Sequence, residues 1–266
     1  MPLVACEHRS AARTGGAGFF NRLLGFLATS TAFKLYDGRA LRGSPSVRNL
    51  TVALLGRSVK GRKIEAHVFS GPKDRTVVVL GAFHGDEPKS VVLARRLIEL
   101  LEENSEAGDN AKWIIVPVVN PDGYARRKRR NANGVDINRN FPTANWVRGM
   151  RRSRMFGGSA PASEPETRAV IAAVELFRPA RIITIHSIGQ NRHCNNYDGP
   201  AGDMAEAMSS VNGYPVTSSI GYATPGSFGT WAGMERGIPS VTLELPSTRS
   251  AKRCWEDNRA ALLGCL

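Results

Sequence analysis

Two apolar runs separated by a helical pattern constrain the fold of this chain more than any other part of the sequence. Val77 to Phe83 is a continuous apolar run, which is typical of a strand buried on both faces of a sheet. Pro88 suits the first turn of a helix, and Trp113 to Val119 forms the next apolar run. Between them, apolar residues recur at helical spacing at Val91, Val92, Ala94, Leu97, Ile98 and Leu101. This order predicts a βαβ unit with parallel strands and a right-handed crossover.

The rest of the chain continues the alternation of strands and helices. Ser163 and Glu166 have the spacing of a capping box and predict a helix that runs to about Phe177. The further expected elements are a strand over Arg181–Ile185 that ends at His186, a short helix over Gly226–Gly237, a strand over Val241–Leu245 and a helix near Glu256–Leu263. We therefore expect an α/β fold, a single domain whose mixed, mostly parallel sheet is flanked by helices. Ligands bind such sheets at the carboxyl ends of the strands.

The first 48 residues differ from the rest, because they lack periodicity and are rich in Gly, Ser, Ala and Arg. We expect an N-terminal extension over residues 1–48 and one functional domain over residues 49–266. Basic residues precede a short apolar run, Leu23 to Leu27, in the manner of a weak secretory signal. A disordered basic tail is the favoured interpretation because that run is short. We thus expect a cytoplasmic protein, with a periplasmic or exported one as the alternative.

The chain carries a net charge of +13, and much of the excess lies in two clusters, Arg126–Arg130 and Arg148–Arg154. A basic surface without a partner, attraction of an anionic substrate or polymer, and nucleic-acid binding all remain open. No nucleic-acid motif accompanies the clusters, so nucleic acid ranks last and is not expected as a partner. No stretch reaches the roughly 18 apolar residues of a membrane span, so we expect no stable membrane insertion.

Three residues have the chemistry and the placement of metal ligands. His84 and Glu87 lie three residues apart in the turn that follows the first buried strand, and His186 ends a second one. Imidazole nitrogens and a carboxylate oxygen suit Zn²⁺, and three protein ligands leave its fourth position open, as catalytic sites do. The alternatives are a helix N-terminus complemented by Glu87 and a core histidine at position 186. The sequence therefore predicts a zinc site.

Further polar residues lie at positions where burial has a cost. Glu244 lies within the apolar strand Val-Thr-Leu-Glu-Leu, which makes it a candidate general base, the alternative being a salt bridge to an arginine. In the segment NANGVDINRNFP, Asp136 can accept a hydrogen bond from a metal-ligating imidazole. Arg139 offers a planar fork for a substrate carboxylate, and Asn138 offers a second donor.

With these residues in this order, the chain resembles the M14 metallocarboxypeptidases, and most closely their bacterial murein peptide amidase branch. The matching segments are GAFHGDE, VVNPDGY, NANGVDINRNFP, the His186-Ser187 strand end, GSAPASEPET, GYATPGSFGTW and TLELP. They run in the order of the family from about residue 77 to 246. The resemblance implies a zinc carboxypeptidase-like fold, with residues 49–266 as the catalytic domain and one Zn²⁺ per chain.

The resemblance also implies roles for individual residues. His84, Glu87 and His186 fall on the metal ligands, and Glu244 falls on the general base. Arg129 best matches the arginine that stabilises the oxyanion, with Arg130 as the alternative. The residues that match positions for substrate binding are Asn138, Arg139, Tyr222, Ser227 and Gly229, together with a loop that contains Asn196, Tyr197 and Asp198.

The resemblance further implies a substrate, which is the γ-D-glutamyl–meso-diaminopimelate bond of the murein tripeptide. The expected partner is thus a small anionic peptide. The alternatives are a general C-terminal carboxypeptidase and a deacylase of N-acyl amino acids. The deacylases share the zinc pattern but are expected to lack the NPDG and NRNF segments. A metal-free binding module is disfavoured because the three candidate metal ligands and the candidate general base Glu244 are all present.

Overall fold

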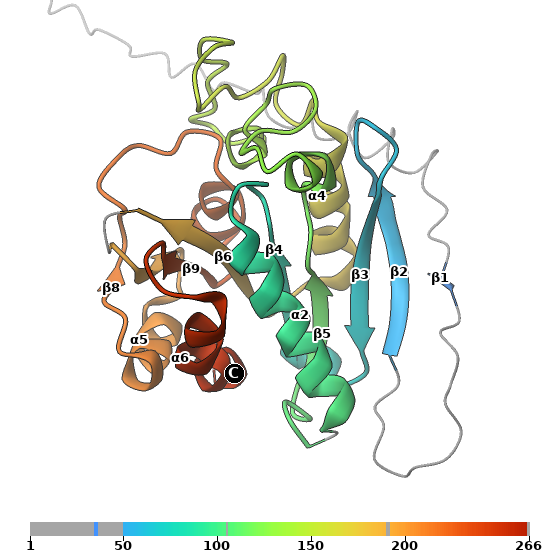
Figure 1. The fold of residues 1–266 in the computed structure, drawn as a ribbon, viewed down its shortest axis with the longest axis vertical. Helices are drawn as coiled ribbons and strands as arrows, with labels where there is room; N and C mark the ends of the chain where they lie inside the picture. Colours follow the sequence, from blue (N-terminus) through green and yellow to red (C-terminus); the bar gives the residue numbers. More distant parts are fainter. Residues whose placement is uncertain (1–34, 37–49, 105, 190–191, 265–266) are drawn as a thin grey trace, which may run out of the picture. The chain divides into compact units, whose positions relative to one another are not determined.

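A mixed β-sheet of nine strands runs through the part of the chain that the computed structural model describes, namely residues 35–36, 50–104, 106–189 and 192–264 (Figure 1). The strand order is β1-β2-β3-β5-β4-β6-β9-β7-β8. The strands are β1 (Leu35–Tyr36), β2 (Leu50–Arg57), β3 (Lys63–Phe69), β4 (Thr76–Gly81), β5 (Lys112–Val116), β6 (Arg181–Ile188), β7 (Cys194–Asp198), β8 (Val216–Thr217) and β9 (Ser240–Pro246).

Five α-helices and three shorter helical segments accompany the described strands. The α-helices are α2 (Pro88–Glu103), α3 (Pro121–Ala125), α4 (Pro165–Phe177), α5 (Gly202–Asn212) and α6 (Ala251–Leu263). The 3-10 segments are η1 (Lys73–Arg75) and η2 (Ile137–Arg139), and the segment η3 (Thr230–Met234) is π-helical. The expectation of an α/β domain with a mixed sheet is therefore confirmed.

Four parallel strands, β5, β4, β6 and β9, form the centre of the sheet. The predicted βαβ unit is β4-α2-β5, in which Val77 pairs with Trp113 in parallel register. Antiparallel pairing appears toward both edges, where β3 joins β5 and β7 joins β9. Parallel central strands must be covered on both faces, which explains their continuous apolar sequences.

Alternate side chains of the central strands enter two separate cores. Val77 and Val79 of β4 join a cluster that contains residues of α2, α5 and α6. Val78 and Leu80 join the other cluster, which contains residues of α4 together with Trp231 of η3. Figure 1 shows α2 crossing in front of the sheet and α4 behind it. The sheet is thus a rigid middle layer, and its strand ends are held in fixed positions.

Some of the predicted element boundaries are wrong. The expected capping box does not form, because α4 begins at Pro165 with Glu164 as its N-cap and has no side-chain cap. Ser163 instead donates a hydrogen bond to the Glu164 carboxylate. The last helix begins at Ala251, several residues earlier than expected, and its N-cap Ser250 accepts a hydrogen bond from Arg253 N.

The expected N-terminal boundary also differs from the structure. Leu35 and Tyr36 fall within the predicted extension, yet they form β1 and pair with Val52 and Ala53 of β2. The unit that contains the sheet runs from Phe33 to Leu266 rather than from residue 49. Residues 1–34 and 37–48 of the predicted extension lie outside the described residues. Among the described helices, none is long and apolar enough to cross a membrane.

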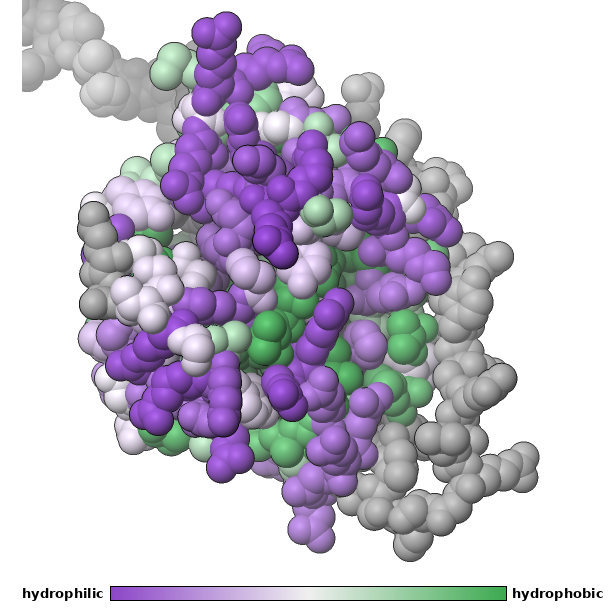
Figure 2. All heavy atoms as spheres, viewed as in Figure 1, coloured by the Kyte–Doolittle hydropathy of each residue, from purple (hydrophilic) through white to green (hydrophobic). Residues whose placement is uncertain are grey.

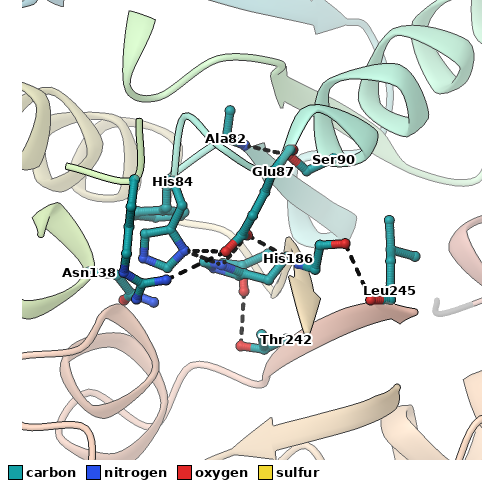
Figure 3. Close-up of polar contacts among 12 residues, drawn as sticks. Ala82, His84, Glu87, Ser90, Asn138, His186, Thr242 and Leu245 are labelled. Atoms are coloured by element: carbon teal, nitrogen blue, oxygen red, sulfur yellow. Dashed lines mark hydrogen bonds and ion pairs between the residues drawn. The ribbon is translucent and has the colours of Figure 1, made fainter. Parts of the chain in front are cut away.

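Ser90 holds the turn that follows β4 in place (Figure 3). Its hydroxyl accepts a hydrogen bond from Ala82 N at 3.0 Å and donates one to Glu87 O at 2.6 Å. Ala82 has a φ of 48°, an uncommon value for a residue other than glycine, and its amide is buried. Ser90 is itself fully buried in the first turn of α2. One hydroxyl thus sets the path of the chain between Ala82 and Glu87.

We predict that Ser90→Ala lowers the free energy of unfolding by about 1–3 kcal/mol, because the buried Ala82 amide loses its partner. Chemical denaturation of the purified variant measures the change. Ser210→Ala is the matched control: this exposed serine bonds only to a carbonyl of its own helix, and its loss is expected to cost less than about 0.5 kcal/mol. Equal stability of the S90A variant and the wild type would contradict this account of the turn.

Candidate active site

His84, Glu87 and His186 converge at the carboxyl ends of β4 and β6 (Figure 3). His84 Nδ1 lies 2.7 Å from Glu87 Oε1, and His186 Nδ1 lies 3.2 Å from Glu87 Oε2. The two Nδ1 atoms lie 3.2 Å from each other. All three side chains are buried. The turn after β4 and the end of β6 therefore direct two imidazoles and a carboxylate toward one point.

These three side chains fit a zinc ion. Two ligands bound at 2.0–2.1 Å in tetrahedral geometry lie about 3.3 Å apart. The His186–Glu87 and His186–His84 contacts are both close to this separation. The His84–Glu87 contact has the length of a hydrogen bond and would lengthen slightly around a metal. His186 also shows the chemistry of a neutral ligand, since burial lowers the pKa of its imidazole.

Asp136 contacts His84 on the side of the imidazole ring that faces away from the other two residues of the triad. Its Oδ1 lies 3.1 Å from His84 Nε2, the ring nitrogen that points away from the convergence point. Its Oδ2 accepts hydrogen bonds from Nε and Nη2 of Arg129 at 3.0 and 2.8 Å. Burial opposes ionisation of Asp136, but His84 and Arg129 outweigh it and hold its pKa well below the usual range. One ionised carboxylate thus orients both His84 and Arg129.

Glu244 occupies the neighbouring strand β9, directly opposite His186 of β6 in the parallel register. It is only 7% exposed, and among the described residues its carboxylate has no hydrogen bond or ion pair. The alternative interpretation, a salt bridge to an arginine, is therefore not observed within the described part of the chain. Burial raises the pKa of Glu244 to about 8, and the Glu87 carboxylate contributes to the rise. A buried carboxylate with a high proton affinity can accept a proton from a group in front of it.

A cavity of about 580 Å³ opens in front of these groups. It is lined by His84, Glu87, His186, Glu244, Arg129, Asn138, Arg139, Asn196, Asp198, Tyr222, Ser227 and Gly229, among others. The structure thus brings together nearly all of the site residues predicted from the sequence. Arg129 lines the cavity and Arg130 does not; Arg130 donates instead to the carbonyls of Arg151 and Ser153.

Arg139 is a buried guanidinium whose hydrogen bonds are incomplete. It is 3% exposed, its Nε has no partner, and Nη1 donates to Asn138 O. It forms no salt bridge within the described part of the chain. Asn138 accepts a hydrogen bond from Phe228 N through its side-chain oxygen, which leaves its amide nitrogen free to donate. An unpaired guanidinium beside an amide donor can bind a carboxylate.

Tyr197 requires a correction, because the segment predicted as a loop is strand β7. Successive side chains of a strand point to opposite faces. Asn196 and Asp198 therefore line the cavity, whereas Tyr197 packs against the apolar cluster of α2, α5 and α6. The sequence CNNYD could have been taken as a strand, and the alternation of side chains along a strand would have separated Tyr197 from Asn196 and Asp198.

Gly229 and Asp198 both line the cavity and lie in close contact with each other. A Cβ atom on Gly229 would lie 2.1 Å from Asp198 Oδ2, so any side chain there would displace the carboxylate. Gly229 therefore makes room for Asp198 and not directly for a ligand, which modifies the prediction of an open pocket floor. Burial raises the pKa of Asp198 to about 6. Asn196 Oδ1, also on β7, is buried and lacks a hydrogen-bond partner.

Two arginines that line the cavity were not among the predicted site residues. Arg154 lies in the loop before α4, and Arg192 lies just before β7. Arg154 belongs to the second basic cluster of the sequence, for which a surface without a partner and attraction of an anionic substrate both remained open. Only its position relative to the triad, set by the folded loop, assigns it to the cavity.

Comparison with known proteins identifies the family. The zinc carboxypeptidase profile, peptidase M14, matches residues 45–197, more than half of the chain and including His84, Glu87 and His186. The chain belongs to the M14 zinc carboxypeptidase family. This M14 peptidase is therefore a metallopeptidase, and family membership implies zinc as its metal.

Individual relatives support the assignment. Murein peptide amidase A of Escherichia coli (strain K12) is 31% identical over 210 residues, which are 73% of this chain and 81% of the relative. Carboxypeptidase B of Helicoverpa zea is 30% identical over 263 residues, with 81% of this chain and 61% of the relative covered. Both relatives bear the names of enzymes that cleave amide bonds.

Solved structures resemble the fold of this M14 peptidase. The crystal structure of a murein-tripeptide amidase from Escherichia coli O157 aligns with a TM-score of 0.64 at 29% identity, covering 88% of this chain and 96% of that one. The carboxypeptidase A from Helicoverpa armigera aligns with a TM-score of 0.69, covering 93% of this chain and 78% of that one. At 22% identity, the second likeness shows the fold alone.

We predict that the wild type binds one zinc ion per chain, and that His84→Ala and His186→Ala each bind close to none, because two protein ligands rarely hold zinc. Metal analysis after gel filtration measures the content. His67→Ala is the matched control, since His67 lies on β3 and not in the cavity, and it should retain zinc. Tight zinc binding by the double H84A/H186A variant would show that the metal lies elsewhere.

Proposed function

We propose that this M14 peptidase hydrolyses the amide between γ-D-glutamate and meso-diaminopimelate in the murein tripeptide. The observation that carries the proposal is the cavity itself, which holds a guanidinium at Arg139 and a carboxylate at Asp198, neither of which forms an ion pair within the described residues. These two charges suit a leaving residue with a terminal carboxylate and a side-chain ammonium. The names of the relatives, a murein peptide amidase and a murein-tripeptide amidase, support the same substrate.

In this proposal His84, Glu87 and His186 hold one Zn²⁺ per chain. Zinc, when bound, supplies a Lewis acid for the scissile carbonyl and lowers the pKa of water. Glu244 accepts the proton of the attacking water and returns it to the leaving amine. A cation at the metal site would lower the pKa of Glu244 from about 8 and so favour its ionised form.

Arg129 is proposed to stabilise the negative charge that develops on the carbonyl oxygen. Asp136 fixes its guanidinium through two hydrogen bonds, and Nη1 lies 3.6 Å from Glu87 Oε1. A donor that is held in place before the reaction loses little energy to reorganisation, which is why such groups contribute strongly to catalysis. We propose Arg129 for this role over Arg130, since Arg130 is directed at the 151–153 loop.

The terminal carboxylate of the substrate is proposed to bind Arg139 and the amide nitrogen of Asn138. Tyr222 lies in a loop that lines the same cavity, and its side chain is 46% exposed. It can therefore cover the leaving residue of the bound substrate. Holding the leaving group by its carboxylate restricts hydrolysis to the last residue of a chain. It also orients the scissile amide toward Glu244.

The side chain of diaminopimelate is proposed to reach Asp198 and Asn196. An ammonium beside Asp198 stabilises the ionised carboxylate, whose pKa burial has raised to about 6. It also satisfies Asn196 Oδ1, which lacks a partner. The hydroxyl of Ser227 lies at the same cavity and can donate to the distal carboxylate. The substrate is thus a small anionic peptide, and we propose that it is met in the cytoplasm.

We predict that Glu244→Gln keeps its zinc and still binds substrate, but that kcat falls by at least about 10²-fold, since an amide cannot accept the proton. Steady-state kinetics with the tripeptide and metal analysis of the same sample measure both quantities. Glu235→Gln, an exposed change outside the cavity, is the control and should turn over normally. A kcat close to that of the wild type would move the general base to another residue.

A second prediction concerns the substrate. The tripeptide that ends in meso-diaminopimelate should exceed the one that ends in Lys by at least about 10²-fold in kcat/KM, because Lys leaves the groups for the distal carboxylate unpaired. Asp198→Asn should raise KM for both peptides, and the exposed control Asp109→Asn should not. An all-L peptide with C-terminal Phe is the comparison. If the Phe peptide is the best substrate, the protein is a general carboxypeptidase, and if only N-acyl amino acids are cleaved, it is a deacylase.

A further inference from the structure

A second, strongly basic groove adjoins the active-site cavity. It has a volume of about 490 Å³, and the basic residues that line it are Arg126, Lys128, Arg129, Arg130, Arg152 and Arg154. Asp86 is the acidic residue among those lining it. Figure 2 shows hydrophilic side chains gathered at the top of the view, over the green to yellow-green loops that Figure 1 draws above α4. The two basic clusters of the sequence are thus brought together in one place.

The groove contains both fixed and uncompensated charges. Arg126 donates to the carbonyls of Asp122 and Asn131, and Arg129 is paired with Asp136. The side chains of Lys128, Arg152 and Arg154 form no hydrogen bond or ion pair with other described residues, and all three are exposed. Three neighbouring cations that form no ion pair within the described residues outnumber the single carboxylate of Asp86, and they favour an anionic ligand.

The groove adjoins the active-site cavity where the two share lining residues. Arg129 and Arg154 line both cavities. In the proposed function, Arg139 and Asp198 hold the leaving residue, and Arg129 faces the scissile carbonyl. The part of the substrate that extends past Arg129 is therefore the acyl part, which lies on the other side of the scissile bond from the leaving residue.

We propose that this groove binds an anionic group on the acyl side of the substrate, with Arg152 and Arg154 as its ligands. In the substrate proposed above, that group is the free α-carboxylate of the γ-linked glutamyl residue. A γ-linkage leaves this carboxylate free, whereas an α-linkage converts it into the scissile amide, so that only an acidic side chain can then supply a carboxylate on the acyl side. The groove therefore favours an acyl residue with a free carboxylate, such as γ-linked glutamate, and the cavity selects the leaving residue. This inference rests on the proposed function.

The test compares two tripeptides that differ by one charge: L-Ala-γ-D-Glu-meso-diaminopimelate and the same peptide with the glutamyl α-carboxylate converted to a carboxamide. The zinc-loaded wild type should prefer the acid by about tenfold in kcat/KM, as one or two partly exposed ion pairs can provide. The R152Q/R154Q variant should show a ratio close to one. The ratio is internal to each sample, so partial unfolding of a variant does not affect it.

Two further measurements make the test specific. Arg148→Gln removes an exposed arginine of the same loop that does not line the groove, and it should keep the tenfold preference. Raising the ionic strength well above about 0.15 M should reduce the preference of the wild type, because exposed charges are screened by salt. A wild type without preference, or an R152Q/R154Q variant that keeps it, would overturn the assignment of the groove.

The outcome also separates this inference from the proposed function. If neither tripeptide is hydrolysed, the proposed substrate is wrong, and the same ratio is measured on ordinary peptides with Glu or Gln before the C-terminal residue. A preference for Glu that disappears in R152Q/R154Q would still support an anion-binding groove on the acyl side. Equal rates on the Glu and Gln peptides would refute the groove as well.

Discussion

The geometry of the site depends on the hydrogen bonds that one buried carboxylate, that of Asp136, makes with its neighbours. Transferring a carboxylate out of water costs several kcal/mol unless it is fully paired. Asp136 meets this condition by contacting His84, Arg129 and the backbone amide of Asn138 together. Because these three partners belong to the proposed metal, oxyanion and carboxylate sites, their relative positions are set by a single group.

The charged groups that face the cavity differ from Asp136 in how completely they are paired. Arg139, Glu244 and Asp198 are buried or partly buried, and within the described residues none of them forms an ion pair. Burial lowers the pKa of Arg139 and raises those of Glu244 and Asp198, so each charge is destabilised where it stands. A substrate that supplies partners for these charges recovers this free energy, which links the burial of the charges to the selectivity of the cavity.

The sequence predicted much of this arrangement for identifiable reasons. His84 and Glu87 follow an apolar run so closely that the turn after β4 must carry both of them. Glu244 was recognisable because a carboxylate inside an apolar strand needs a reason to be there. Tyr197 was misassigned because the polar sequence of β7 resembles a loop. The capping box at Ser163 failed because its hydroxyl bonds to Glu164 and Asn140 instead.

The sequence by itself determined the βαβ unit, the chemistry of the metal ligands and the candidate base, since these follow from local periodicity and from residues near strand ends. Only the tertiary structure decided that Gly229 makes room for Asp198, that Arg129 rather than Arg130 faces the cavity, and that Arg154 belongs to the site. These features depend on contacts between segments far apart in the chain. No local pattern encodes such contacts, because they arise when the sheet places β7, η3 and the basic loops around the same strand ends.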